Sequence, residues 1–174
     1  MSLHILIDGY NLIRQSPALS DIDRRSLEEG REALLECLAS YKRVKHHPIT
    51  VVFDGAGADT HMERRTGWKG IAVVFSRPGE LADSVIKRIV NRERERAIVV
   101  TSDRDIADFA AKHGAETVDS IEFEGKMKMA VQLDLSLTDL RDEEEGWIPT
   151  TRKKGPSRRI SKRGRKRRVR TRKL

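Results

Sequence analysis

Apolar residues along this chain form short runs of strand length, and between the runs they recur at helical spacing. Near-continuous apolar runs of four to five residues are typical of strands buried on both faces, at the centre of a parallel sheet. The predicted strands are residues 3–7, 49–53, 71–75, 97–101 and a shorter one at 116–118. The pattern therefore predicts strands that alternate with helices.

Four stretches between and after these runs have a helical pattern. Ser26 and Glu29 fit a capping box that begins a helix reaching about residue 44. Further helices are expected at 80–95, between Asp105 and Gly114, and at 120–140 with an interruption near Gly125. Leu27 and Leu81 are assigned to the buried faces of the first two, and residues 55–70 to a long polar loop. This order predicts a three-layer α/β fold around a mostly parallel sheet.

Four aspartates follow predicted strands or begin predicted helices. Right-handed crossovers place the carboxyl end of each parallel strand, and the start of each following helix, along one edge of the sheet. The four are Asp8, Asp54, Asp83 and Asp103. We expect them to converge at that edge, where ligands bind in open α/β sheets.

Carboxylates gathered within a few ångström repel one another and need a cation to remain ionised together. The chain has one cysteine, and its five histidines show no ligand spacing, so oxygen ligands dominate. Such a set suits Mg²⁺ or Mn²⁺. These ions activate water and stabilise the charge that develops on a phosphodiester, so the expected chemistry is phosphodiester hydrolysis.

Each aspartate also has a purely structural explanation. Asp8 could close an Asx turn after its strand, and Asp54 could close a turn with the glycine that follows it. Asp83 could pair with Lys87 on the same helix face, and Asp103 could cap its helix. Their shared edge favours a site over four coincidences.

Four short motifs, in this order and spacing, resemble the YacP-like NYN domain family. They are Ile7-Asp8-Gly9-Tyr10-Asn11, Val51-Val52-Phe53-Asp54-Gly55, Glu80-Leu81-Ala82-Asp83 and Thr101-Ser102-Asp103. The resemblance covers residues 3–120 and implies a PIN-like, Rossmann-like three-layer fold. It also implies a metal-dependent endoribonuclease that acts in RNA processing or decay.

The resemblance assigns roles to particular residues of this chain. The catalytic, metal-binding acids it implies are Asp8, Asp83 and Asp103. Supporting positions are Asn11, Ser102 and Asp54, together with Asp105, for which a surface acid at a helix start is the alternative. RNA is the expected substrate, and ribosome-associated RNA is one form that it could take.

Charge divides the chain into two parts. Residues 152–173 contain 14 Lys or Arg and no acid, so 21 basic and 27 acidic side chains remain for the rest. We expect a nuclease domain at 1–145 and a polybasic tail at 146–174, disordered or extended, that binds RNA phosphates. Candidate RNA-binding residues are Arg158, Arg159, Arg165, Arg167 and Arg168 in the tail, and Arg64, Arg65, Trp68 and Lys69 in the polar loop.

Several other classes are disfavoured. Gly55-Ala56-Gly57 lacks the third glycine of a dinucleotide site, because Thr60 stands there, so no nucleotide cofactor is expected. No signal peptide or membrane span is recognisable, and we expect a cytoplasmic protein.

The main alternative to a nuclease is a non-catalytic RNA- or ribosome-binding module with a vestigial acidic pocket. A Toprim-like domain, suggested by Asp103-Arg104-Asp105, is a weaker one, because it normally has Glu where Asp8 stands.

Overall fold

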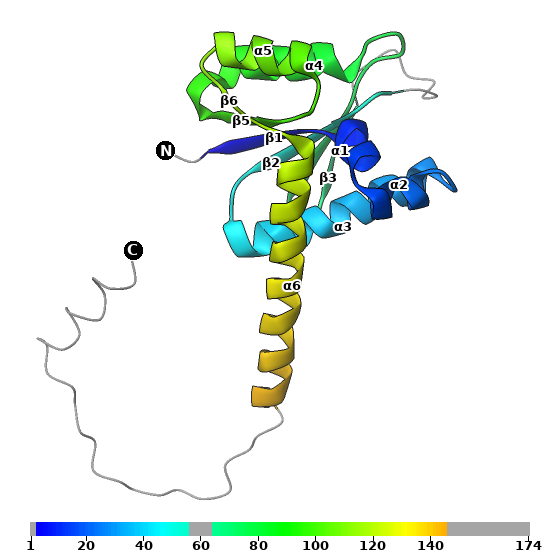
Figure 1. Cartoon of the computed structure of the whole chain (residues 1–174), viewed down its shortest axis with the longest axis vertical. Helices are drawn as coiled ribbons and strands as arrows, with labels where there is room; N and C mark the ends of the chain where they lie inside the picture. The colour runs from blue at the N-terminus through cyan, green and yellow to red at the C-terminus, as the bar shows by residue number, and fades with distance from the viewer. Residues whose placement is uncertain (1–2, 56–63, 146–174) are drawn as a thin grey trace, which may run out of the picture. The chain divides into compact units, whose positions relative to one another are not determined.

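A six-stranded sheet forms the centre of the computed structural model, which describes residues 3–55 and 64–145, with side chains to residue 138 (Figure 1). The strand order is β3-β4-β2-β1-β5-β6. Their bounds are β1 His4–Asp8, β2 Ile49–Phe53, β3 Arg64–Trp68, β4 Ile71–Phe75, β5 Ala97–Val100 and β6 Glu116–Val118. Every neighbouring pair is parallel except β3 with β4. The predicted mostly parallel sheet is confirmed.

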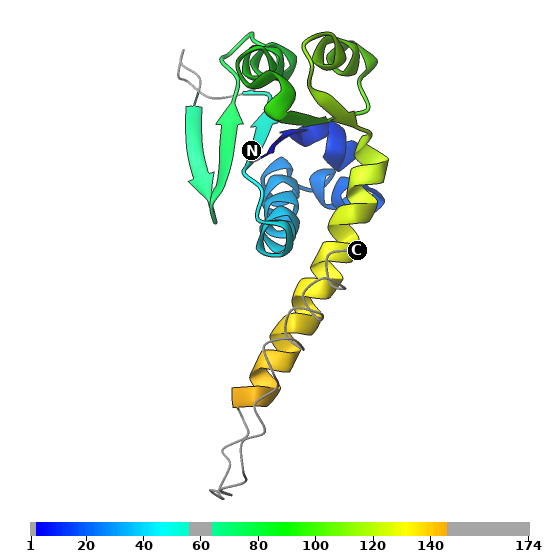
Figure 2. The same cartoon turned by 90° about the vertical axis from the view of Figure 1, so that its left-hand side faces the viewer.

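Helices cover both faces of this sheet (Figure 2). Their bounds are α1 Gly9–Gln15, α2 Pro17–Asp23, α3 Leu27–Lys45, α4 Ala82–Glu93, α5 Arg104–Lys112 and α6 Ser120–Glu145, with a short 3₁₀ turn η1 at Arg94–Arg96. Helices α4 and α5 share one core with the sheet, and α1, α2, α3 and the first half of α6 share the other. The three-layer α/β architecture is therefore confirmed.

Alternate residues of the central strands supply the two cores. On β1, Leu6 belongs to the core under α4 and α5, whereas Ile5 and Ile7 belong to the opposite core. All five residues of β2 are buried. A strand that is buried on both faces cannot show apolar and polar alternation, which is why these strands read as continuous apolar runs.

Three expectations about local structure are wrong. The polar loop at 55–70 contains β3, an exposed edge strand paired with β4, and residues 56–63 lie outside the described residues. Helix α6 runs through Gly125 without interruption. Leu27 and Leu81 are 57% and 67% exposed, because they stand at the beginnings of α3 and α4, past the margin of the core.

By its contacts the chain divides into the units Met1–Leu140 and Arg141–Leu174. The predicted polybasic tail, including its candidate RNA-binding arginines, lies outside the described residues. Within the described ranges, none of the helices combines the length and apolar character needed to cross a bilayer.

Two glycine-to-alanine substitutions are predicted to have opposite effects on stability. A methyl group at Gly9 would lie 2.2 Å from a ring carbon of the fully buried Phe53, so Gly9→Ala should lower the free energy of unfolding by about 1–3 kcal/mol. Gly125 has nothing within 4 Å, and Gly125→Ala should raise it by about 0.5–1 kcal/mol. Urea denaturation measures both. An unchanged stability of Gly9→Ala would show that Phe53 does not press against the start of α1.

Candidate active site

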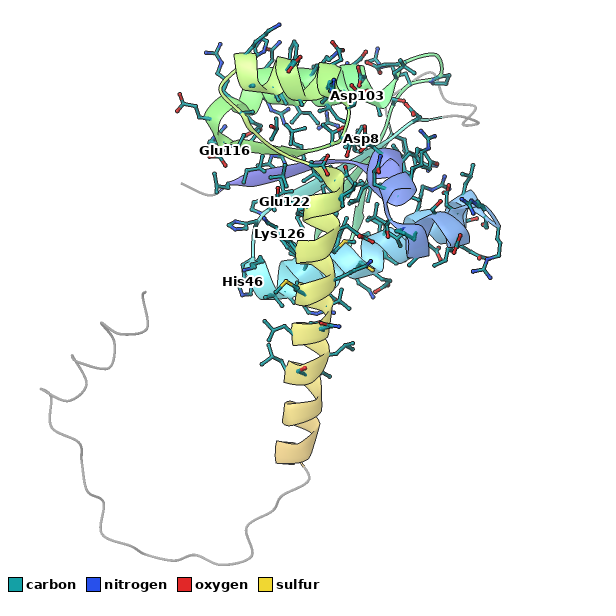
Figure 3. All side chains as sticks on the ribbon, in the orientation of Figure 1. Asp8, His46, Asp103, Glu116, Glu122 and Lys126 are labelled. Atoms are coloured by element: carbon teal, nitrogen blue, oxygen red, sulfur yellow. The ribbon has the colours of Figure 1, made fainter. Side chains whose placement is uncertain are left out.

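Three of the four predicted acids follow three adjacent strands. Asp8 is the last residue of β1, Asp54 directly follows β2, and Asp103 ends the connection from β5 to α5. The order β2-β1-β5 places these strand ends side by side, and Figure 3 labels Asp8 and Asp103 at this edge. Asp83 lies in the first turn of α4, which follows β4. We call this group of four the acidic edge.

Two of these acids cap the helices that follow them. Oδ1 of Asp8 accepts a hydrogen bond from the backbone N–H of Asn11 at 3.2 Å, at the start of α1. Oδ1 of Asp103 accepts from the backbone N–H of Asp105 at 2.8 Å, at the start of α5. The structural explanations for both residues are therefore correct, and each leaves the second carboxylate oxygen without a hydrogen-bond partner among the described residues.

The start of α4 is tied to the same edge. Oδ1 of Asp54 accepts from the backbone N–H of Ala82 at 2.6 Å, which anchors the turn that carries Asp83. Lys87 reaches back from the next turn, with Nζ 3.1 Å from Oδ2 of Asp83 and 2.5 Å from Oδ2 of Asp105. The hydrogen bond from the Lys87 ammonium lowers the pKa of Asp105. The predicted pairing of Asp83 with Lys87 is thus present, and it includes Asp105.

Asp8 experiences the charge of the whole group. Burial, together with the charges of Asp54, Asp83 and Asp103, raises the pKa of its carboxyl group to about 6, against the opposing effect of the hydrogen bond from the N–H of Asn11. A carboxyl group whose pKa is raised by three others is close enough to interact with all of them. The structure therefore places Asp54, Asp83 and Asp103 near enough to Asp8 for their charges to act on its carboxyl group.

A hydrogen-bond network joins the predicted supporting residues. Oδ1 of Asn11 accepts from the backbone N–H of Ser102 at 2.9 Å and from Oγ of Ser120 at 2.7 Å. Oγ of Ser102 donates to Oδ2 of Asp119 at 2.8 Å. Ser120 is fully buried, and neither it nor Asp119 was identified from the sequence. Their position directly before a helical pattern was the signal available, since Ser and Asp are common helix caps.

The acidic edge fits a hard divalent cation in its donor chemistry. Its carboxylate oxygens are the ligands that Mg²⁺ and Mn²⁺ prefer. In the described ranges, however, no three acidic, histidine or cysteine side chains are grouped closely enough to hold one ion. Binding of an ion would therefore require rotation of carboxylates that now interact with backbone N–H groups and with Lys87.

The candidate RNA-binding residues of the polar loop lie on the outer strand and just after it. These are Arg64, Arg65 and Trp68 of β3, followed by Lys69. The guanidinium carbon of Arg64 is 4.5 Å from the ring centroid of Phe75. Trp68 is half-buried against the core, and Lys69 forms an ion pair with Glu36 at 2.7 Å. Arg64, Trp68 and Lys69 thus each contact other parts of the protein.

One pocket lies away from the acidic edge. It has a volume of about 570 Å³ and is lined by Tyr41, Val44, Lys45 and His47 of the α3 end, with Lys126, Met129, Ala130 and Leu133 of α6. Figure 3 labels His46 and Lys126 in that part of the molecule, away from Asp8. Its lining contains no acid, so it does not share the chemistry of the acidic edge.

The three-layer fold and the acidic edge agree with the resemblance seen in the sequence. The chain belongs to the YacP-like NYN domain family, which matches residues 5–167. It therefore carries a domain of a nuclease-like, RNA-related class.

Individual relatives come from Bacillus subtilis. The chain is 32% identical over 102 residues to the uncharacterized protein YacP of strain 168, a match that spans 57% of this chain and 59% of that protein, less than two thirds of its length. The crystal structure of Rae1 (YacP) aligns with a TM-score of 0.67 at 26% identity, covering 84% of this chain and 85% of that one. A tryptophan-to-leucine mutant of Rae1 gives 0.62 at 26% identity, with coverage of 75% and 77%.

Replacement of Asp8 is predicted to stabilise the fold in a pH-dependent way. The folded chain holds the Asp8 proton up to about pH 6, whereas the unfolded chain loses it near 3.8, so stability falls as pH rises between these values. Asp8→Asn should raise the free energy of unfolding near neutral pH by about 1–3 kcal/mol, and the difference should vanish near about pH 4. Denaturant titrations in EDTA across this range test it. A stability difference that does not depend on pH would contradict the raised pKa.

Proposed function

We propose that this chain is a divalent-metal-dependent endoribonuclease that hydrolyses RNA phosphodiester bonds at the acidic edge and acts in RNA processing or decay. The observation that supports it most is the placement of Asp8, Asp54 and Asp103 at the ends of three adjacent strands, with Asp83 in the first turn of α4. Carboxylates that approach one another from separate segments are stabilised by positive charge, and we assign that role to a divalent cation in addition to Lys87.

Asp8, Asp83 and Asp103 are the acids we assign to cation binding and catalysis. Bound Mg²⁺ or Mn²⁺ would supply activation of water and neutralisation of the charge on the phosphodiester. Asp54 would position Asp83, because it anchors the first turn of α4. Asn11 would hold the β5–α5 connection, and with it Asp103, through its bond to the backbone of Ser102.

RNA as the substrate is supported by the family and by the charge distribution. An edge with four carboxylates repels phosphates, whereas the 14 basic side chains at 152–173 attract them. We assign this tail the role of holding RNA near the acidic edge. RNA associated with the ribosome belongs to the same proposal, and the protein would act in the cytoplasm.

Loss of Asp83 is predicted to abolish cleavage without loss of folding. Asp83→Asn should lower metal-dependent cleavage of RNA by about 100-fold or more, because a carboxylate ligand is lost. Wild-type cleavage should also stop in EDTA. Asp108→Asn is the matched control, since Asp108 is an exposed acid of α5 outside the acidic edge, and its activity should equal that of the wild type. Cleavage that persists in EDTA or in Asp83→Asn would refute the proposal.

A second candidate function is a non-catalytic RNA- or ribosome-binding module. It is favoured by the absence, among residues 3–55 and 64–145, of three ligands grouped to hold an ion, and by Lys87, which already neutralises Asp83 and Asp105. Such a module would bind RNA in EDTA with strong salt dependence and would show no metal-dependent cleavage by the wild type.

The Lys87 ammonium is predicted to compete with a metal ion for Asp83. Lys87→Met removes a positive charge 3.1 Å from the Asp83 carboxylate, so the affinity for Mn²⁺ should rise by about fivefold. Titration calorimetry with MnCl₂ measures this without any cleavage. Lys45→Met, an exposed lysine of α3 away from the acidic edge, serves as the control and should leave the affinity unchanged. Weaker binding in Lys87→Met would instead make Lys87 a support for the site.

A further inference from the structure

A smaller pocket lies between α3 and the β3–β4 side of the sheet, close to the acidic edge. It has a volume of about 180 Å³, and its lining includes Glu28, Arg31, Glu32, Arg64, Trp68 and Phe75. Figure 2 shows this side of the sheet, where β3 is the outermost strand. Phe53 also lines the pocket and directly precedes Asp54. Because Phe53 and Asp54 are consecutive residues, the pocket lies next to the acidic edge.

A row of aromatic rings connects the pocket with the acidic edge. The ring centroids of Tyr10 and Phe53 are 5.1 Å apart, and those of Phe53 and Phe75 are 5.7 Å apart with nearly parallel planes. Phe53 is fully buried, whereas Phe75 is half-buried and lines the pocket. Phe75 thus ends the row with a flat ring over which the exposed Arg64 side chain lies, and Tyr10 stands two residues after Asp8.

Two guanidinium groups flank the Phe75 ring. The guanidinium carbon of Arg64 is 4.5 Å from the ring centroid, and that of Arg31 is 5.7 Å away. Arg31 also donates a hydrogen bond from Nη1 to the hydroxyl oxygen of Tyr10 at 2.9 Å, which fixes its position. Arginine planes and aromatic rings together are the surfaces on which proteins stack unpaired RNA bases.

Two carboxylates lie on the α3 side of the pocket. Glu28 and Glu32 are one helical turn apart, and neither forms an ion pair with a described residue. The pocket therefore combines the flat ring of Phe75, the N–H donors of two planar guanidinium groups, and carboxylate oxygens, which only accept hydrogen bonds. Phosphate alone would be repelled by the two glutamates, whereas a base with donors and acceptors on separate edges would satisfy both kinds of group.

We propose that this pocket binds one unpaired guanine base of an RNA strand. Guanine stacks on Phe75 in the place of the exposed Arg64 guanidinium, an arginine donates to its O6 and N7 acceptors, and a glutamate accepts from its N1–H and amino group. Uracil has no amino group to offer Glu28 or Glu32, so guanine is preferred over uracil. This inference deepens the proposed function and rests on it, since it names the base that positions the RNA.

The location of the pocket gives guanine binding a consequence for cleavage. Tyr10 and Phe53 join the pocket to Asp8 and Asp54, so the phosphodiester next to the bound guanosine lies toward the acidic edge. Cleavage should therefore occur beside guanosines in single-stranded RNA.

Trp68 in the pocket wall makes binding observable without catalysis. In full-length Trp147→Phe protein, Trp68 is the one remaining tryptophan, and its fluorescence is followed in EDTA as nucleotides are added. Guanosine monophosphate should quench it saturably, uridine monophosphate should bind about tenfold more weakly, and inorganic phosphate should have no effect.

Substitutions in the same protein identify the contacts. Phe75→Ala should weaken binding of guanosine monophosphate by about tenfold through loss of stacking, and Phe75→Tyr should retain it. Glu28→Gln and Glu32→Gln should reduce the preference for guanine over uracil. Glu36→Gln, one turn further along α3 and outside the pocket lining, is the matched control and should keep it. Urea denaturation verifies that each variant is folded.

The two proposals can fail separately. Equal quenching by guanosine and uridine monophosphates, quenching by phosphate alone, or unchanged binding in folded Phe75→Ala would overturn the guanine pocket, even if metal-dependent RNA cleavage is observed. Selective guanine binding that depends on Phe75, together with no cleavage in Mg²⁺ or Mn²⁺, would support the pocket and refute the nuclease proposal.

Discussion

The parallel pairing of β2, β1 and β5 is the constraint on which the rest of this structure depends. Its register sets Asp8 opposite Val52 and Ile7 opposite Val100, so the three strands end at nearly the same level. Residues that follow these strands must therefore share one edge, however far apart they are in the sequence. The acidic edge, the beginnings of the helices and the row of aromatic rings all follow from this register.

The same geometry explains how the fold tolerates four neighbouring carboxylates. Helices α1, α4 and α5 begin at this edge, so their backbone N–H groups and the positive ends of their dipoles face the acids. Asp8, Asp54 and Asp103 each accept one such N–H, and Lys87 adds a full positive charge beside Asp83. Compensation is incomplete at Asp8, where burial and the other acids still raise the pKa.

The sequence predicts the central sheet well because parallel strands that are buried on both faces appear in it as continuous apolar runs. It does not predict β3, since an exposed edge strand of mostly polar residues lacks the alternation that marks a half-buried one. Gly125 suggests a break by its low helix propensity, but a long helix that packs Phe123 and Met127 into the core overrides one glycine. Ser120 could not be assigned to the site, because its bond to Asn11 joins segments 109 residues apart.

The structural explanations of the four acids do not apply equally. Capping accounts for Asp8 and Asp103, and anchoring of α4 accounts for Asp54, so these residues would be useful to the fold without any ligand. Asp83 bonds to none of the helix-start N–H groups among the described residues, and its hydrogen bond there is the half-buried pair with Lys87 on the same helix. Asp83 is thus the one of the four acids that neither caps nor anchors the start of a helix. Its charge nevertheless acts on Asp8, whose pKa it raises together with Asp54 and Asp103, so a role for Asp83 at this edge is tested by its substitution rather than by its contribution to the fold.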